Sequence, residues 1–274
     1  MKSTQDANEA LFAGTVIKAM DIVDSLADSR RPLSTQEIAT ACGLSRPTAY
    51  RLLTTLISRG YVRQTGNFQF TLGTRLLTLS RLVLYDLDLL EIARPYLHEL
   101  CSVSNETANL SILDNGELLY IGKQESQRGS QLPTSVQLRS TVGTRIPPHS
   151  SAMGKAMMAY LPQAALAELL EKSAPLKRFT PYTITDTEVL HAQFSEIRRL
   201  GYAIDEREVD EGTRCIGAPV FDSSGRVAGA MSISGPAYRV TVEGLHELAP
   251  AVVRVSQDVS RQLGYGGVPA GDAD

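Results

Sequence analysis

The amino-acid sequence predicts two domains of different fold class: a small, mainly helical domain that ends in a β-hairpin, and a larger α+β domain after it. Residues 34–60 contain two short amphipathic segments with helix-start and helix-stop signals. Residues 91–265 alternate helix-like and strand-like segments, and most of the strand-like segments come in pairs joined by tight turns. With 274 residues, of which 43% are hydrophobic, the chain can fill two ordinary cores.

The first predicted helix covers residues 14–29, where apolar side chains form one broad face. They are Val16, Ile17, Met20, Ile22, Val23 and Leu26. We expect this helix to complete a three-helix core with the two that follow.

The next two helices are predicted from their caps. Ser34 and Glu37 form a capping-box pattern, and Gly43 can take the positive φ that ends a helix. Ser45 is suited to cap the following helix, in whose first turn Pro47 is tolerated. Two helices joined by a turn of about three to four residues have the layout of a helix-turn-helix.

The last helix of this motif has two different faces and stops at Gly60. Its apolar stripe consists of Leu52, Leu53, Leu56 and Ile57, and its outer face carries Arg46, Thr48, Arg51 and Thr55. The outer face is therefore basic and rich in hydroxyl groups.

A wing is predicted directly after this helix. Val62, Phe68 and Phe70 alternate with polar residues around Gly66-Asn67, a two-residue turn of the kind that closes hairpins. Two strands after a recognition helix complete a winged helix-turn-helix.

Charge favours DNA as the partner of this domain. Residues 31–75 hold six arginines and one acid, Glu37, a net charge of +5, whereas the whole chain carries −3. No acid occurs between Glu37 and Asp86, as expected of a surface that approaches phosphates. The alternative is a winged domain that binds protein, but the caps, the turn, the hairpin and the charge agree independently. The residues expected to contact DNA are Ser34, Thr35, Ser45, Arg46, Pro47, Thr48, Tyr50, Arg51 and Arg63.

A leucine-rich helix is predicted to join the domains. Residues 74–90 hold no Gly or Pro. Their apolar surface needs a partner, either the second domain of its own chain or a second copy in a twofold dimer, which would present two recognition helices to two half-sites. We expect a DNA-binding domain over residues 1–73, this linker helix, a second domain over residues 91–265 and a disordered tail over residues 266–274.

The second domain is predicted to contain an antiparallel sheet with helices around it. Its helices are expected at residues 92–103, with Pro95 in the first turn, at 150–161 and 162–172, at 185–200, where Thr185 and Glu188 form a capping box and Gly201 ends the run, and at 240–263. Its strands are expected at residues 106–113 and 118–124, joined by an Asp114 to Glu117 turn, at 131–140, and at 214–222 and 227–235.

A ligand site is predicted where several of these segments meet. The amides of Ala152, Met153 and Gly154 lie in the first turn of a helix, which suits a carboxylate or another anion. Ser232 and Ser234 stand two apart on one strand and so point to one face. Asp205 and Cys215 flank a loop, and Met153 and Met231 are candidates for an apolar end of the site.

Composition excludes several other classes. No segment resembles a membrane span or a signal peptide, which predicts a cytoplasmic protein. The cysteines Cys42, Cys101 and Cys215 are odd in number and far apart, which favours free thiols. The four histidines stand alone, so neither a metal site nor a cofactor is expected.

The chain resembles the IclR family of bacterial transcription regulators over nearly its full length. The resemblance rests on LSRPTAYRLLTTLISRGYV, RIPPHSSAMGKAMMAYLP and GYAIDEREVDEGTRCIGAPVFDSSGRVAGAMSISGP. It implies a winged helix-turn-helix, a linking helix and a GAF-like C-terminal domain that binds a small organic acid or aromatic metabolite. It also implies a homodimer through the DNA-binding half, often paired into a dimer of dimers. The effector residues it implies are Ala152, Met153, Asp205, Cys215, Ser232 and Ser234, to which the helix start adds Gly154.

Together these features predict a ligand-responsive DNA-binding regulator, one that controls a catabolic operon, and not an enzyme. A carboxylate would be repelled by Asp205 unless this residue is protonated or binds a ligand hydroxyl, which favours a hydroxylated acid.

Several alternatives stay open at the level of sequence. Cys215 alone is more often a small core residue, the two serines could bond to neighbouring backbone, and His149 could simply fix its loop. A hydrolase would use Cys215 or Ser150 as nucleophile with His149 as base, but the chain has no GxSxG motif. A redox-sensing regulator would act through Cys215.

Overall fold

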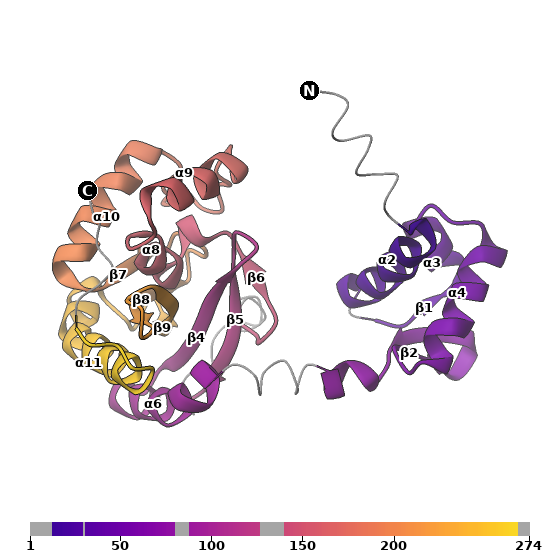
Figure 1. Ribbon diagram of the computed structural model, residues 1–274, viewed down its shortest axis with the longest axis horizontal. Helices are drawn as coiled ribbons and strands as arrows, with labels where there is room; N and C mark the ends of the chain where they lie inside the picture. The colour runs from indigo at the N-terminus through magenta and orange to yellow at the C-terminus, as the bar shows by residue number, and fades with distance from the viewer. Residues whose placement is uncertain (1–12, 30, 80–87, 127–139, 268–274) are drawn as a thin grey trace. The chain divides into compact units, whose positions relative to one another are not determined.

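The computed structural model describes residues 13–29, 31–79, 88–126 and 140–267. The chain divides into two compact units, Met1–Asp86 and Leu87–Asp274, with separate internal packing (Figure 1). The unit break after Asp86 falls within the predicted linker helix, and the finer domain boundaries stay a prediction.

The N-terminal unit packs three helices on a three-stranded antiparallel sheet. Its elements are α2 (Gly14–Ser29), β1 (Leu33–Ser34), α3 (Thr35–Ala41), α4 (Arg46–Ser58), β2 (Val62–Thr65) and β3 (Gln69–Leu72), and the strand order is β1-β3-β2. The core joins all of them through Ile22, Leu26, Leu33, Ile38, Leu53, Leu56, Val62 and Phe70. The predicted winged helix-turn-helix is therefore confirmed.

The predicted caps of the helix-turn-helix are confirmed. The Ser34 hydroxyl accepts from the Glu37 amide at 3.3 Å, and the Glu37 carboxylate accepts from the Ser34 amide at 2.8 Å. Gly43 has φ +62°, and the Ser45 hydroxyl accepts from the Thr48 amide at 3.4 Å. These signals were readable because both partners of each bond lie within one helical turn.

Two details of this unit differ from the prediction. On α2 only Ile22 and Leu26 are buried, whereas Val16, Ile17 and Met20 are 57%, 45% and 47% exposed. The hairpin loop has three residues, Gly66–Phe68, because Thr65 pairs with Gln69 in the sheet. Phe68 consequently lies at the loop tip and not inside a strand.

The linker prediction is only partly covered by the described residues. Residues 75–79 are helical, and residues 80–87 lie outside the described part of the chain. The next helix, α6 (Asp88–Ser104), already includes residue 88, so the predicted start at Ile92 was too late. Pro95 lies inside α6 on its exposed side, where the missing backbone hydrogen bond faces solvent.

The C-terminal unit is a three-layer α+β domain. Its sheet is antiparallel with the strand order β6-β5-β4-β9-β8-β7. The strands are β4 (Thr107–Asp114), β5 (Glu117–Gln124), β6 (Arg145–Ile146), β7 (Ala203–Glu206), β8 (Thr213–Phe221) and β9 (Val227–Pro236). Asn115 and Gly116 close the β4–β5 hairpin with φ of 51° and 83°.

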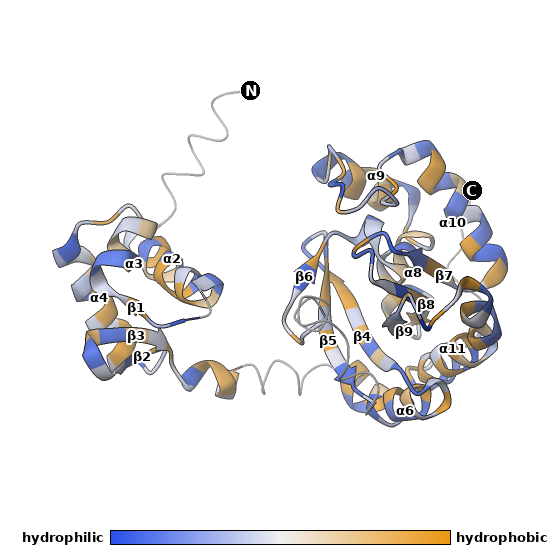
Figure 2. Cartoon of the chain, turned by 180° about the vertical axis from the view of Figure 1, so that it is seen from behind, coloured by the Kyte–Doolittle hydropathy of each residue, from blue (hydrophilic) through white to orange (hydrophobic). Residues whose placement is uncertain are grey.

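Helices cover both faces of this sheet. Figure 1 shows α6 and α11 (Val242–Gln262) side by side on one face, and α8 (Ala152–Met158) on the other. Next to α8 lie α9 (Gln163–Lys172) and α10 (Thr187–Leu200), which pack with it around Phe194. Figure 2 shows apolar and polar residues mixed around α6 and α11, as expected of helices with one face on a sheet.

Four helix starts, those of α8, α9, α10 and α11, were predicted one or two residues too early. A 3-10 turn over Pro148–Ser150 precedes α8, whose cap is Ser151, so α8 begins at Ala152 and has seven residues. The α10 cap is Asp186, whose Oδ1 accepts from the amides of Glu188 and Val189, and not Thr185. An ionised carboxylate is the stronger acceptor for two amides at once. Gly201 ends α10 at φ +81°, as predicted.

Other predictions fall outside the described residues or were incomplete. The strand expected at residues 131–140 lies outside them except for Ser140, and so does the tail from residue 268. The two-residue strands β1 and β6 were not predicted, because two residues are too few to show alternation. Within the described residues, no helix is long and apolar enough to cross a bilayer.

Candidate functional site

The outer face of α4 presents the predicted DNA contacts to solvent. Arg46, Pro47, Tyr50 and Arg51 are exposed, and Tyr50 is 61% exposed. Thr48 is half-buried, and its hydroxyl lies 2.8 Å from that of the exposed Ser45. The remaining predicted contacts are Arg63, exposed on β2, and the half-buried Ser34 and Thr35 at the start of α3.

Arginines on this unit are available for an external anion. Within the described part of the chain no ion pair is formed by Arg46, Arg51, Arg59, Arg63 or Arg75. Among the arginines that the structure describes in this unit, only Arg31 is paired, with Glu37 at 2.9 Å. Hydrogen bonds from the Ser34 amide and hydroxyl and from Arg31 lower the pKa of Glu37 to about 2. The one acid of the segment is therefore ionised and engaged, and the free positive charge lies on α4 and the wing.

A cavity of about 40 Å³ lies between α8, the segment from β7 to β8, and the inner face of the sheet. Its walls are Tyr120, Ser140, Ser151, Ala152, Met153, Asp205, Val209, Asp210, Thr213, Cys215, Ser232 and Ser234. The structure thus brings together Ala152, Met153, Asp205, Cys215, Ser232 and Ser234, six of the seven residues expected to bind an effector.

Gly154 is the seventh, and it does not line the cavity. Its amide donates to the Ser151 hydroxyl at 3.0 Å. A Cβ at this position would stand 2.1 Å from the carbonyl oxygen of Pro148, so the missing side chain serves packing against backbone and not access for a ligand. Gly217 on β8 plays the same part on the other side, since a Cβ there would stand 3.0 Å from the Met153 nitrogen.

Strand register explains which side chains share the cavity. Cys215 is directly opposite Ser234 and also opposite Asp205, and Gly217 is opposite Ser232. Because strand side chains alternate between faces, Met231 points away from this set, and it does not line the cavity. The expectation that Met231 shapes the site was therefore wrong.

Asn109 on β4 was not predicted as a residue of this site. It is fully buried opposite Ser232, and its Nδ2 donates to the hydroxyl oxygens of Ser234 at 3.1 Å and Ser232 at 3.5 Å. Its Oδ1 has no hydrogen-bond partner among the described residues. The signal was present in the sequence, because Thr107, Asn109 and Ser111 put polar residues at every second position of a buried strand.

A buried ion pair lies next to Asp205, on the side away from the cavity. The Lys155 ammonium on α8 is bonded to the Glu208 carboxylate and donates to Gln193 Oε1 on α10 at 3.1 Å. Lys155 is 1% exposed and Glu208 3%. Burial raises the pKa of Glu208. This pair had no sequence signature, since Lys155 reads as an ordinary helix residue.

Asp205 itself is buried beside this pair. Its Oδ1 accepts from the Glu208 amide at 2.6 Å. Burial, and secondarily the Glu208 charge, raise the pKa of Asp205 to about 7, although Lys155 and the backbone amides act in the other direction. A large fraction of Asp205 is therefore protonated near and below pH 7, and in that form it can donate a hydrogen bond to a ligand.

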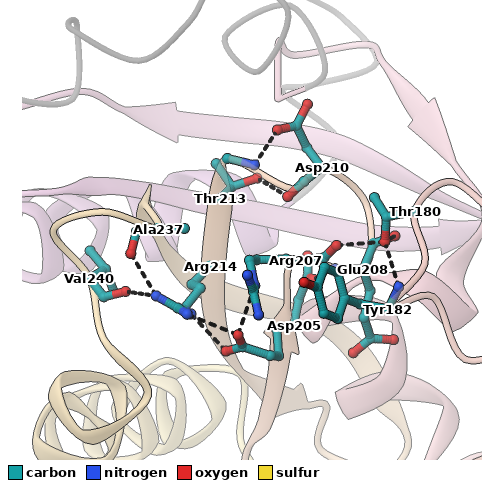
Figure 3. A network of polar contacts seen from close by, with 12 residues as sticks. Thr180, Tyr182, Asp205, Arg207, Glu208, Asp210, Thr213, Arg214, Ala237 and Val240 are labelled. Atoms are coloured by element: carbon teal, nitrogen blue, oxygen red, sulfur yellow. Dashed lines mark hydrogen bonds and ion pairs between the residues drawn. The ribbon is translucent and has the colours of Figure 1, made fainter.

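The segment from β7 to β8 is clamped at its base, as Figure 3 shows. Arg214 donates to both carboxylate oxygens of Glu206, at 2.7 and 3.0 Å. Its third nitrogen donates to the carbonyl oxygens of Ala237 at 2.6 Å and Val240 at 2.9 Å. These bonds tie the edge strand β7 to the end of β9.

The tip of the same segment is held by the loop before α10. Arg207 has φ +62° and its guanidinium lies 4.0 Å from the ring centroid of Tyr182. Thr180 donates to the Arg207 carbonyl at 2.8 Å (Figure 3), and Thr183 donates to the Glu208 carbonyl at 2.6 Å. The cavity wall that carries Asp205 is consequently anchored on both sides.

The residues of the alternative enzymatic and redox hypotheses are engaged in other contacts. Burial, and then Asp205, raise the pKa of the Cys215 thiol, which disfavours the thiolate that nucleophilic or redox chemistry needs. Ser150 donates to the Pro147 carbonyl at 3.2 Å. His149 Nε2 lies 3.0 Å from the Lys177 carbonyl, and burial lowers the pKa of His149. His149 thus ties down its loop.

A larger, open groove of about 590 Å³ runs beside α9. Its rim carries Glu168 paired with Lys172, both well exposed. His149 is the one predicted candidate residue among its walls. Polar groups from four strands and α8 converge on the smaller cavity, which makes it the better candidate for a specific ligand. No cluster of metal-ligating side chains occurs in the described ranges.

Comparisons with known proteins cover both units. The model "IclR helix-turn-helix domain" matches residues 15–66, and "Bacterial transcriptional regulator IclR C-terminal" matches residues 81–261. The HTH-type transcriptional regulator KdgR of Dickeya chrysanthemi is 33% identical over 256 residues, which span 93% of this chain and 81% of KdgR. The transcriptional repressor IclR of Escherichia coli is 29% identical over 257 residues, 93% of this chain and 90% of the repressor.

Solved structures agree with these matches. The crystal structure of Thermotoga maritima IclR superimposes with a TM-score of 0.76 at 31% identity and covers 93% of this chain and 100% of that one. An IclR homolog of Microbacterium hydrocarbonoxydans, solved with 4-hydroxybenzoate, shares the fold at a TM-score of 0.78 and 22% identity, over 91% of this chain and 98% of that one. A winged helix-turn-helix with unpaired arginines, joined to an α+β domain with a polar cavity, thus matches one family in both parts, and the chain belongs to the IclR family of bacterial transcriptional regulators.

Proposed function

We propose that this regulator binds a small hydroxylated organic acid in the cavity beside Asp205, and that occupancy of the cavity changes its affinity for operator DNA. The observation that carries the proposal is the convergence of neutral hydrogen-bond donors on one cavity. The ligand would shift the population of conformers in the C-terminal unit, and with it the presentation of α4 to DNA.

The neutral hydrogen-bond donors of the cavity suit an anionic ligand that is bound without a positively charged side chain. Ser232 and Ser234 accept from Asn109, and Ser234 is also hydrogen-bonded to the Cys215 thiol, which leaves the Ser232 hydroxyl hydrogen available to a ligand. The amides of Ala152 and Met153 lie in the first turn of α8, where no intrahelical acceptor precedes them. The Lys155 ammonium is committed to Glu208 and Gln193. With seven residues, α8 is too short for its dipole to carry the binding.

Asp205 favours a ligand that is hydroxylated as well as acidic. A protonated Asp205 next to a ligand hydroxyl can donate or accept, whereas an ionised one would repel the ligand carboxylate. Carboxylate affinity should therefore weaken as pH rises through about 7. This direction distinguishes the proposal from a simple cationic anion site.

The cavity has to enlarge to admit such a ligand. Its volume of about 40 Å³ is close to that of one water molecule. Met153 borders the cavity, and its sulfur accepts from the Ser111 hydroxyl at 3.1 Å. Methionine has three soft side-chain torsions, so movement of Met153 is the least costly way to open the space.

We also propose that the regulator works as a homodimer through its N-terminal half, and that dimers pair further. Val16, Ile17 and Met20 on α2 and Leu77 after the wing are exposed apolar residues of the N-terminal unit. Twofold pairing over them would cover this surface and supply two recognition helices for two half-sites. Analytical ultracentrifugation of the intact protein tests this, and a monomer at micromolar concentration would contradict it.

The effector class is tested by thermal shift on the intact protein. The probes are matched acids with and without a hydroxyl, lactate against propionate and 4-hydroxybenzoate against benzoate, at pH 6 and 8. We expect a hydroxylated member to stabilise the C-terminal unit, more strongly at pH 6, and the double variant Ser232→Ala/Ser234→Ala to lose the effect. Stabilisation that survives in the double variant would move the site elsewhere, and no response to any probe would refute this effector class.

The regulated genes are expected to encode breakdown or uptake of the sensed compound, in the cytoplasm where operator DNA lies. Transcript levels in a deletion strain, with and without the compound identified by thermal shift, test this. Unchanged transcription of every neighbouring operon would contradict it.

A further inference from the structure

Phe68 at the tip of the wing combines an unfavourable backbone with an exposed aromatic ring. The loop Gly66–Phe68 places Asn67 at φ 65° and Phe68 at φ 54°. The left-handed region suits glycine and asparagine, whereas for a bulky side chain it is strained. Three-residue hairpin loops usually place a glycine at the final left-handed position. This chain has phenylalanine there.

Packing within the chain does not compensate for this strain. The side chain of Phe68 is 81% exposed, while Phe70, two residues later, is 4% exposed in the core of the same unit. The aromatic ring therefore contributes almost nothing to folding. A strained, solvent-exposed phenylalanine at a loop tip indicates a contact made outside the chain.

Charge identifies the partner of this contact. The described residues of the wing, 62–72, contain one ionisable side chain, Arg63, and it forms no ion pair within the described part of the chain. The polar neighbours Gln64, Thr65 and Gln69 carry amides and a hydroxyl. An aromatic tip surrounded by a cation and neutral donors complements nucleic acid, which combines phosphates with apolar sugar and base surfaces.

Geometry selects the groove. In a helix-turn-helix the recognition helix occupies the major groove. Only the turn at Arg59 to Tyr61 separates α4 from β2, so the hairpin leaves the end of that helix. With α4 in the major groove, we expect the tip of the hairpin to face the neighbouring minor groove. Sugar faces line that groove, and phenylalanine is one of the residues that insert there between base steps.

We propose that Phe68 is a DNA contact of this regulator: its ring enters the minor groove beside each half-site and partly unstacks one base step. The inference rests on DNA binding by α4 and adds an apolar contact to it. It predicts a preference for easily unstacked pyrimidine–purine steps at the flanks of the operator.

The test uses the intact protein and a fluorescent 40-base-pair duplex obtained by in vitro selection with the wild type. Phe68→Ala should weaken binding by about tenfold or more, the loss expected for one apolar side chain, whereas Phe68→Leu should stay within about threefold. The slope of affinity against salt should not change, because no phosphate contact is lost. Arg63→Ala should instead lower that slope by about one.

Three measurements separate this contact from a structural role. Tyr238→Ala removes an aromatic side chain that is 79% exposed on the other unit, and it should leave DNA affinity unchanged. Phe68→Gly relieves the left-handed strain, so it should unfold at a higher temperature than Phe68→Ala yet bind DNA equally weakly. A 2-aminopurine at the flanking step should brighten with the wild type and not with Phe68→Ala.

The inference is overturned if Phe68→Ala binds the selected duplex as tightly as the wild type. It is also overturned if the loss coincides with dissociation of the oligomer in ultracentrifugation, which would make Phe68 a subunit contact. Failure of every protein, wild type included, to select any duplex would instead refute DNA binding itself.

Discussion

The two units use polar side chains in opposite ways. On α4 the arginines are exposed and unpaired, and each acts through a charge directed at solvent. Around the C-terminal cavity the polar groups are buried, and each depends on a partner from another strand or helix. We therefore expect contacts made by α4 to be additive and sensitive to salt, whereas the buried polar groups form a network in which one change alters several groups.

The largest expected effect lies on the additive side. Arg46→Ala with Arg51→Ala should weaken operator binding by about 100-fold or more, because each lost groove contact costs on the order of 1–3 kcal/mol. The salt slope should fall, and melting of the C-terminal unit should not change. Fluorescence anisotropy over a salt series measures this, and affinity within threefold of the wild type would show that α4 does not read DNA.

Lys155→Met tests the network side. It leaves the buried Glu208 without its cation and should destabilise the C-terminal unit by about 3–5 kcal/mol in urea unfolding. The matched variant Lys155→Met/Glu208→Leu removes both charges and should recover most of the loss. If the double variant were as unstable as the single one, the pair would not act as a unit.

Asp205→Asn tests the buried network through the pH dependence of folding stability. A carboxyl with a raised pKa in the folded state contributes stability that is fully present below its unfolded pKa and lost as pH rises through about 7. Between pH 5 and pH 8 the wild type should therefore lose about 3 kcal/mol of stability relative to Asp205→Asn, because about two pH units of this range lie between the unfolded and the folded pKa. Cys215, Glu208 and Lys155 face Asp205 in both proteins, so the difference isolates Asp205. A constant difference across this range would contradict the shifted pKa.

Asn109→Leu gives the smallest expected change in stability. Removing an amide whose Oδ1 is unpaired should leave stability within about 1 kcal/mol of the wild type or raise it. Binding of a hydroxylated acid should nevertheless fall about tenfold, because the serine hydroxyls lose the donor that orients them. Thr107→Val, on the same face of β4 with an equally unpaired hydroxyl, is the control and should keep binding. Equal losses in both variants would remove Asn109 from the site.

The contrast between the units also explains what the sequence could predict. The capping box at Ser34 and the cap at Ser45 involve residues three apart, so local chemistry reveals them. Phe68 was misplaced because a two-residue and a three-residue loop fit the same alternation, and the pairing of Thr65 with Gln69 decides between them. Local signals identify an element reliably but place its ends less well.

Whether a residue of the cavity could be predicted depended on how far its partners lie along the chain. The contributions of Ser232 and Asp205 were predicted from the family resemblance, but Lys155 was not, since its partners Gln193 and Glu208 are 38 and 53 residues away. Gly154 was misassigned because a glycine in a helix start suggests ligand access, whereas here it allows contact with the Pro148 carbonyl. Only the folded backbone separates those two reasons for a missing side chain.

The two glycines that flank the start of α8 have a practical consequence for protein engineering. A methyl group at Gly154 would clash with the Pro148 carbonyl, and one at Gly217 would press on the Met153 amide at the start of α8, so both positions should be kept in any library that seeks a biosensor for a new compound. Val209 and Thr213 border the cavity from the clamped segment and take no part in the Lys155–Glu208 pair. Randomising them, with Tyr120 as a third position, would vary the shape of the cavity while the Lys155–Glu208 pair and the packing of α8 stay intact.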